Sequence, residues 1–377
     1  MRTASVLALL ALALALALAL VALPACGGGS SFSGSNTTPA PTGTFTNVLD
    51  PTEAAVRELH TATRLSQNAE TLICGGRDAA QFLATAEVYA EIGDTFTAVG
   101  PLATARARHT ATLLPDGTVL VAGGGTQGGV TASAELFDPV MRAFRPASSP
   151  LLAARQNHVA IRVDDGSVFV FGGDDGGAAV FAGVERYVIG GGFQGAGALQ
   201  TARSRLTATF LDGPGDDVLV AGGFTATGPT AVVELYSPTL RTSRILAEPL
   251  RVARANHAAV RLGDGRVLII GGTDAAGQPL THCEVYDPRN ERSTPLQVGL
   301  ATARATPRAS TLLDGRVLVT GNAQTAEIFD LSTSTFGPAG GQLMFARTNH
   351  TQIPLTGPET LIVGGLAAGR TAELFTE

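Results

Sequence analysis

Residues 106–124, RARHTATLLPDGTVLVAGG, carry the signals from which the fold of this chain is predicted. An Asp-Gly pair in the middle of the stretch separates two short apolar runs, which is the strongest local signal for a β-hairpin. An Arg-x-x-His sequence precedes the first run, and two glycines follow the second. The stretch therefore predicts one strand at about 109–114, a tight turn, and a second strand at 119–122.

The same unit occurs seven times along the chain. The apolar strand that ends in glycine recurs every 43 to 50 residues, and its first glycines are Gly75, Gly123, Gly172, Gly222, Gly271, Gly321 and Gly364. Each copy has a later apolar strand with a Glu-x-aromatic sequence, whose glutamates are Glu87, Glu135, Glu185, Glu234, Glu284, Glu327 and Glu373. A repeat of this length is typical of propellers and solenoids.

A fourth strand completes each copy. In three copies it is marked by a phenylalanine seven residues after the aromatic of the third strand, at Phe96, Phe144 and Phe336. A single four-stranded sheet of this kind has two apolar faces, which seven sheets stacked around an axis can bury. We therefore predict an all-β fold, a seven-bladed β-propeller with four-stranded antiparallel blades.

The two ends of residues 43–377 predict how the ring closes. The last residues, TAELFTE, form a third strand with no fourth strand after it, whereas GTFTNV at 43–48 matches the fourth-strand sequence DTFTAV at 94–99. The first strand is therefore expected to complete the last blade. Such closure leaves no open sheet edge between the first and last blades.

The paired glycines and the later Glu-x-aromatic strand, at a period near fifty, resemble the kelch repeat family. The sequence Arg-x-x-His followed by Asp-Gly-x-Val-Leu-x-x-Gly-Gly is similar, more narrowly, to bacterial kelch proteins related to the central domain of galactose oxidase. The resemblance extends over essentially all of residues 43–377 and implies a kelch-type propeller. It says much less about function.

Galactose oxidase uses copper with tyrosine and histidine ligands and a Tyr-Cys crosslink, and this chain departs from that pattern. Its four tyrosines all occupy the aromatic position of a third strand, and it has no tryptophan. Neither His282 nor Cys283 supplies the missing set. We therefore predict no catalytic residues, no metal site and no cofactor.

Residues 1–25 have the features of a secretory signal, with a basic start and a long Leu/Ala run. The sequence Leu-Pro-Ala-Cys that ends at Cys26 resembles the bacterial lipoprotein box, which implies lipidation of this cysteine. An uncleaved membrane helix or an ordinary signal is the alternative. Residues 26–42 are rich in Gly, Ser and Pro and predict a flexible tether. A location in the bacterial envelope follows, in the outer membrane because glycine follows Cys26.

The remaining cysteines, Cys74 and Cys283, lie in apolar strands of distant repeats and are expected to be buried free thiols. The net charge is −6 and the 26 basic residues, all arginine, are spread along the chain. Nucleic acid binding needs clustered basic charge, so we predict no nucleic acid partner.

An arginine and a histidine recur at the start of the first strand. The arginine is present in all seven copies, at Arg57, Arg106, Arg155, Arg203, Arg254, Arg304 and Arg347. The histidine follows three residues later in five copies, at His60, His109, His158, His257 and His350. The main interpretation is structural: the arginines pair with loop carbonyls or with the repeated glutamates, and the histidines pack beside them. The alternative is that these side chains face the mouth of the central channel and bind an acidic glycan or a carboxylate.

The function predicted from these features is a non-catalytic binding module that recognises a protein or a glycan through one face of the propeller. A membrane is expected as a partner only through the lipid anchor. Two alternatives stay open: an extracytoplasmic carbohydrate-active enzyme (a lyase, isomerase or oxidase) and a structural subunit of a surface complex.

Overall fold

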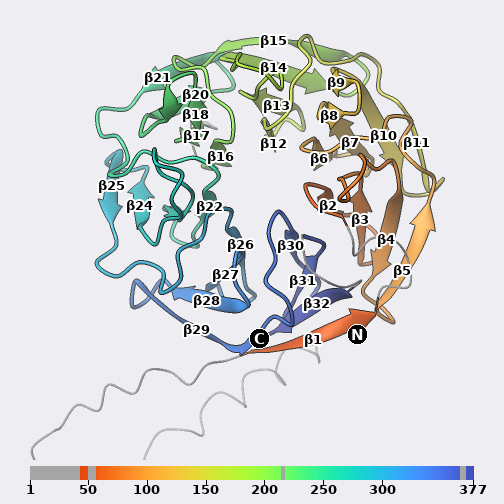
Figure 1. Ribbon diagram of the computed structural model, residues 1–377. Coiled ribbons are helices and arrows are strands. Elements are labelled where there is room, and N and C mark those ends of the chain that lie inside the picture. The colour runs from red at the N-terminus through yellow and green to blue at the C-terminus, as the bar shows by residue number, and fades with distance from the viewer. Residues whose placement is uncertain (1–42, 50–56, 214–216, 366–370) are drawn as a thin grey trace, which may run out of the picture. The chain divides into compact units, whose positions relative to one another are not determined.

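The computed structural model describes residues 43–49, 57–213, 217–365 and 371–377, which all belong to the compact unit 40–377. The predictions for 1–25 and 26–42, with Cys26, lie outside the described residues. No helix is present among the residues described, and hence none that could cross a membrane. The strands form seven four-stranded antiparallel sheets around a central axis (Figure 1), which confirms the predicted propeller.

Each blade takes its four strands in order from the axis outward. The first strands are β2 (Thr61–Arg64), β6 (Thr110–Leu113), β12 (Val159–Arg162), β16 (Thr207–Phe210), β22 (Ala258–Arg261), β26 (Arg308–Thr311) and β30 (Thr351–Pro354). The second strands are β3 (Glu70–Cys74), β7 (Val119–Ala122), β13 (Val168–Phe171), β17 (Val218–Ala221), β23 (Val267–Ile270), β27 (Val317–Thr320) and β31 (Glu359–Val363). The third strands are β4 (Ala86–Ala90), β10 (Ala134–Asp138), β14 (Gly183–Val188), β20 (Val233–Ser237), β24 (Cys283–Asp287), β28 (Thr325–Asp330) and β32 (Thr371–Thr376). The fourth strands are β5 (Thr95–Val99), β11 (Ala143–Pro146), β15 (Gly192–Ala198), β21 (Thr242–Ile245), β25 (Arg292–Pro295), β29 (Thr335–Gln342) and, for blade 7, β1 (Thr44–Leu49).

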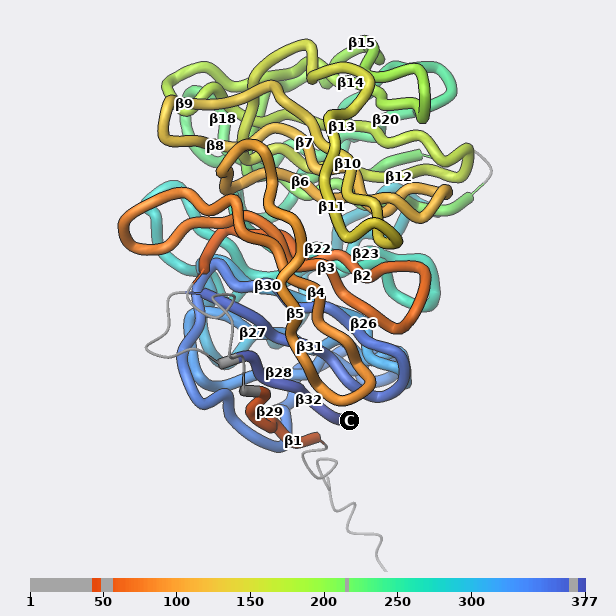
Figure 2. Tube along the Cα trace, turned by 90° about the vertical axis from the view of Figure 1, so that its right-hand side faces the viewer, coloured from red at the N-terminus to blue at the C-terminus, as the bar shows by residue number. Residues whose placement is uncertain are grey.

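The two ends of the propeller differ. The Arg-x-x-His sequence and the paired glycines lie together at one end, where the N–H of Gly124 donates to the carbonyl of Arg155 in the next blade (2.8 Å). We call this end the mouth face. It also carries two short hairpins, β8–β9 (Gly125–Thr126 and Gly129–Val130) and β18–β19 (Phe224–Thr225 and Gly228–Pro229). The Asp-Gly turns and the turns between third and fourth strands lie at the opposite end, the hairpin face (Figure 2).

Strand β1 closes the ring as predicted. It pairs antiparallel with β32, from Thr44 opposite Thr376 to Leu49 opposite Thr371. The rings of Phe45 and Phe375 lie 5.0 Å apart across this pair. The first and last segments of the propeller are therefore held in one sheet, with ladder hydrogen bonds at the seam.

The core lies between adjacent blades. The second strands are buried on both faces, and in β7 all four residues are buried. Leu120 and Leu136 of blade 2 pack with Val168, Val170 and Tyr187 of blade 3, and equivalent clusters occupy the other blade junctions. Each blade therefore depends on its neighbours to cover its apolar faces.

Aromatic pairs join the third and fourth strands. The centroids of Tyr89 and Phe96 lie 4.9 Å apart, as expected from their seven-residue spacing. Blade 3 has the same contact between Tyr187 and Phe193 at 5.0 Å, although the spacing there is six. Cys74 and Cys283 are free and buried, as predicted, and burial raises the pKa of each thiol to about 11.

Candidate functional site

The seven repeated arginines are structural. Arg106 donates from Nη1 to the carbonyls of Gly123 and Ser133 (both 2.8 Å) and from Nη2 to Glu135 (2.8 Å). The second carboxylate oxygen of Glu135 accepts the N–H of Ala103 at 2.7 Å. One ion pair thus joins the second and third strands of a blade to the segment that leads into it. The pairs are Arg57–Glu87, Arg106–Glu135, Arg155–Glu185, Arg203–Glu234, Arg254–Glu284, Arg304–Glu327 and Arg347–Glu373.

These arginine side chains are at most 3% exposed, so the pairing predicted as the main interpretation is confirmed. None of the seven guanidinium groups lines the mouth of the channel. An anionic ligand could reach one of them only by displacing its glutamate. A buried charge left without its partner is strongly unfavourable.

The five repeated histidines are also buried, and each joins its blade to the preceding one. The Nε2 atom of His109 lies 2.9 Å from the hydroxyl of Thr61, and that of His158 lies 3.0 Å from the hydroxyl of Thr110. The equivalent pairs are His257–Thr207 (2.8 Å) and His60–Thr351 (2.8 Å), whereas His350 contacts Thr320 at the end of the second strand of blade 6 (2.7 Å). Burial first, and then the neighbouring arginine, lowers the pKa of His109, His158 and His257 to about 3. These rings are neutral at pH 7 and add no positive charge to the channel.

The buried histidines predict a loss of stability in acid. A folded-state pKa of about 3, against an ordinary value of 6.5, means that the unfolded chain binds the proton more tightly. The stabilisation is therefore fully present above pH 6.5 and is lost as the pH falls from 6.5 towards 3. His109, His158 and His257 should each account for about 2–3 kcal/mol of the difference in unfolding free energy between pH 7.5 and pH 4.5. Urea unfolding of the wild type and of His158→Gln at both pH values measures this, and an equal acid loss in both proteins would contradict it.

The mouth is lined by four of the repeated histidines, His60, His109, His158 and His257, and by a second set of residues. This second set occupies the position two residues after the repeated arginine, at Leu59, Arg108, Asn157, Arg205, Asn256, Thr306 and Asn349. Six of the seven have a left-handed backbone with φ between 52° and 57°, and Thr306 is the exception. The residues of this second set were not predicted from the sequence. The recurrence of asparagine here was the available signal, because asparagine tolerates this conformation better than most residues.

Backbone hydrogen bonds join six of these residues in an open series, while the N–H of Thr306 donates to the side chain of Asn322. The N–H of Arg108 donates to the carbonyl of Leu59 (2.9 Å), and the N–H of Asn157 donates to the carbonyl of Arg108 (3.2 Å). The same bond runs from Arg205 to Asn157, from Asn256 to Arg205, and from Leu59 to Asn349. Together with Arg308 and the four histidines, these residues line a cavity of about 230 Å³, large enough for a small anionic group.

The cavity is electropositive. Among the described residues, no carboxylate oxygen lies within 4.0 Å of the guanidinium nitrogens of Arg108, Arg205 or Arg308. Burial first, and then repulsion by Arg205, lowers the pKa of Arg108. Arg308 donates from Nε to the carbonyl of His350 at 2.8 Å. Three cations therefore share a small space without the counter-charge that partly buried guanidinium groups require.

The nearby carboxylates Glu58 and Asp174 attract Arg108 at longer range but form no ion pair with it. Glu58 accepts the side-chain amide of Asn349 (2.8 Å) and pairs with Arg77 outside the mouth. Asp174 accepts the side-chain amides of Gln156 (3.0 Å) and Asn157 (2.8 Å). Both acids thus orient amide side chains at the rim and leave the arginines open to an added anion.

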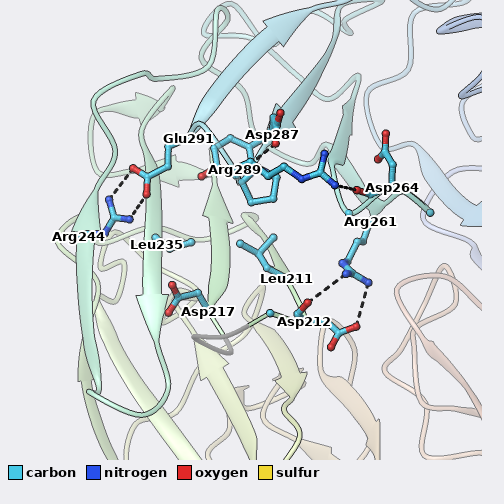
Figure 3. Close-up of a pocket in the computed structure, with 15 residues that line it drawn as sticks. Leu211, Asp212, Asp217, Leu235, Arg244, Arg261, Asp264, Asp287, Arg289 and Glu291 are labelled. Carbon is cyan, nitrogen blue, oxygen red and sulfur yellow. Dashed lines mark hydrogen bonds and ion pairs between the residues drawn. The ribbon is translucent and has the colours of Figure 1, made fainter.

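A second cavity, of about 570 Å³, lies on the hairpin face between blades 4 and 5 (Figure 3). Its apolar wall includes Leu211 and Leu235. Its charged side chains pair largely with one another, as Arg244 does with Glu291. Because its charges already have partners, this groove has less tendency than the mouth to attract a charged ligand.

The copper site of galactose oxidase does not fit the residues present. Within the described ranges, no three His, Cys, Asp or Glu side chains are grouped closely enough to hold a metal ion. Each of the five repeated histidines already shares Nε2 with a threonine hydroxyl. The four tyrosines are third-strand residues of the blade cores, as their sequence positions indicated.

Comparisons with known proteins agree with this architecture. A family model described as the Kelch motif matches residues 253–297, and no curated protein sequence matches the chain. Many solved structures share the fold. One is a fungal alcohol oxidase of the AA5 family in complex with copper, which is 16% identical with a TM-score of 0.68, over 89% of this chain and 76% of the oxidase chain. At this identity the likeness shows the fold alone. The chain therefore contains a kelch motif and is a kelch-type seven-bladed β-propeller.

Proposed function

We propose that the protein is a non-catalytic binding module that recognises an anionic group of a protein or glycan partner at the mouth of its central channel. The observation that carries the proposal is the set of three guanidinium groups, Arg108, Arg205 and Arg308, in one cavity of about 230 Å³ without a paired carboxylate. Guanidinium groups bind carboxylates and sulfates through short, charge-assisted hydrogen bonds. The series of backbone hydrogen bonds includes Arg108 and Arg205 and fixes the main-chain spacing of these two residues before a ligand arrives, which reduces the ordering cost of binding.

Calorimetric titration of the purified chain tests the site. The probes are a uronic acid disaccharide, the neutral disaccharide of the same linkage, and an aspartate-rich peptide, so that glycan and protein sources of the carboxylate are distinguished. Arg108→Gln and Arg205→Gln should each weaken binding of the acidic probe about tenfold. The melting temperature should stay the same or rise slightly, because one source of repulsion is removed. Arg145→Gln, an exposed arginine on β11, is the matched control. Unchanged affinity in both mouth variants would refute the site.

The rival function is a carbohydrate-active enzyme, which the AA5 relative favours only through its fold. Metal analysis of the purified chain and a turnover screen on neutral and acidic glycans separate the two functions. If the wild type turns over a glycan and Arg108→Gln does not, the protein is an enzyme whose active site lies at the mouth, and the proposal of a non-catalytic binding module is wrong. Crosslinking in membranes tests the third alternative, a stable surface complex.

The envelope location is part of the same proposal and rests on the sequence ending at Cys26. Lipidation at this cysteine would hold the propeller at a bacterial membrane, with the outer membrane as the expected destination. Mass spectrometry of the mature N-terminus tests the modification. Cys26→Ser should move the protein from the membrane fraction to the soluble fraction; equal fractionation of both forms would contradict the anchor.

A further inference from the structure

Large apolar side chains are exposed at the turns between third and fourth strands. Ile92 is 85% exposed in blade 1, Val140 and Met141 are 79% and 73% exposed in blade 2, and Leu240 is 72% exposed in blade 4. Ile189 occupies the equivalent turn of blade 3 and is also exposed. Four successive blades thus present apolar tips on the hairpin face. Exposed apolar side chains that recur at the same turn of neighbouring blades are a candidate interaction surface, although single apolar residues such as Leu152 and Val298 are exposed elsewhere.

The turns do not need these apolar residues. In blade 2 the turn Asp138-Pro139-Val140-Met141 is held by the carboxylate of Asp138, which accepts the N–H groups of Val140 (2.9 Å) and Met141 (3.1 Å). Blade 5 has the same turn, in which Asp287 accepts the N–H of Arg289 at 2.9 Å. There the tip residues are Arg289 and Asn290. The same backbone turn therefore forms with polar residues at its tip. The apolar tip residues are not needed for folding, which points to a contact with another molecule.

The chain reaches the propeller on this same face. Thr44, the first residue of β1, lies opposite Thr376, where β32 ends. The next residue, Glu377, accepts the N–H of Leu313 (2.5 Å), beside the Asp-Gly turn of blade 6. Gly43 therefore lies at the hairpin face. Sixteen residues separate it from Cys26, and a chain of that length spans at most about 60 Å.

From these observations we infer that the hairpin face docks on a phospholipid bilayer, with the tips Ile92, Val140, Met141 and Leu240 inserted at the interface. In blade 4 the apolar tip is followed at once by an exposed arginine, Arg241, which suits the level of the lipid phosphates, whereas Arg142 of blade 2 is paired with Glu70. The inference rests on the proposed anchor at Cys26. Its consequence is an orientation: the mouth, with its cations, points away from the membrane.

Single-cysteine labels measure the orientation directly. The native thiols Cys74 and Cys283 are buried, so Met141→Cys on the hairpin face and Thr227→Cys on the mouth face can each be labelled with a polarity-sensitive fluorophore. The full lipidated chain is reconstituted in vesicles of phosphatidylcholine and phosphatidylglycerol that contain nitroxide-labelled lipid. The label at Met141 should be quenched at least fivefold more than the label at Thr227.

Substitutions at neighbouring tips supply the matched comparison. In the Met141→Cys protein, adding Ile92→Asp and Leu240→Asp should reduce quenching at least twofold, whereas adding Leu152→Asp should not. Leu152 is 64% exposed and lies in the segment that leads to Arg155 on the mouth face. Unchanged melting temperatures verify that these exposed sites leave the fold intact.

The outcomes separate this inference from the anchor on which it rests. Vesicle association without quenching of the Met141 label means that the chain is anchored but the face is not docked, which overturns the inference alone. Failure of the full chain to associate with vesicles, with Cys26 unmodified, removes the anchor and the inference with it. Sedimentation that shows a dimer broken by Met141→Ser would assign the face to a second copy of the chain and also overturn docking on lipid.

Discussion

Replacing Arg106 with alanine is expected to destabilise the propeller by about 3–5 kcal/mol, because it leaves the carboxylate of Glu135 buried without its counter-charge. The side chain of Arg106 is fully buried, and that of Glu135 is 5% exposed. The carbonyls of Gly123 and Ser133 lose their donors in the same step. Urea unfolding followed by far-ultraviolet circular dichroism measures the change, since the chain has no tryptophan.

Two further variants make this result specific. Arg244→Ala removes an arginine from an exposed ion pair with Glu291 and should change the unfolding free energy by less than about 1 kcal/mol. Arg106→Met combined with Glu135→Leu should be less destabilising than Arg106→Ala, because no charge is left alone in the core. If the repeated arginines bound a ligand and had no structural role, Arg106→Ala would leave the melting temperature unchanged. That outcome would contradict the structural role of Arg106.

The second large effect is expected from Gly172→Ala. Gly172 has φ of +63°, and a Cβ atom there would lie 2.3 Å from the carbonyl oxygen of Arg203 and 2.9 Å from Leu206. A left-handed alanine costs roughly 1–2 kcal/mol, and forcing an extra methyl into a packed site costs about 1–3 kcal/mol more. The expected loss of unfolding free energy is therefore about 2–5 kcal/mol, measured by the same urea titration.

Gly277→Ala is the matched control for the backbone. Gly277 has a similar φ of +76°, but nothing lies within 4 Å of the position that its Cβ would take. Only the conformational cost of roughly 1–2 kcal/mol should remain. Equal losses in the two variants would show that the repeated glycines are required for their backbone angle and not for the close contact between blades.

Much of the fold could be predicted from the sequence because the same pattern of buried strands, hairpin turn and paired glycines occurs seven times. The apolar run Val119–Ala122 predicts a strand that is buried on both faces, and β7 has those bounds. Closure by the first strand followed from comparing residues 43–48 with the other fourth strands, and β1 lies there. The contact of Phe193 was missed, because the glycine-rich turn of blade 3 shortens the spacing by one residue.

The candidate site could be predicted only in part. Residues that recur in every copy, such as Arg106, stood out in the sequence and are structural, since identical surroundings demand identical partners. The mouth residues vary from blade to blade, so alignment of the copies hid them. Leu59 and Arg108 also have a left-handed backbone conformation, which leucine and arginine rarely adopt, so their residue types did not predict it. Arg308 takes a position that is threonine in four other blades, and only the structure shows that it lines the cavity.

The backbone hydrogen bonds around the mouth bear on how its residues can vary. Their donors and acceptors are N–H and carbonyl groups, from Leu59 through Arg108, Asn157 and Arg205 to Asn256. Over these blades the spacing of the lining residues is therefore set by the main chain and not by their side chains. Arginine, asparagine and leucine already occupy equivalent places in this one molecule. Exchange of these side chains is therefore expected to change what the mouth binds more than it changes the width of the opening.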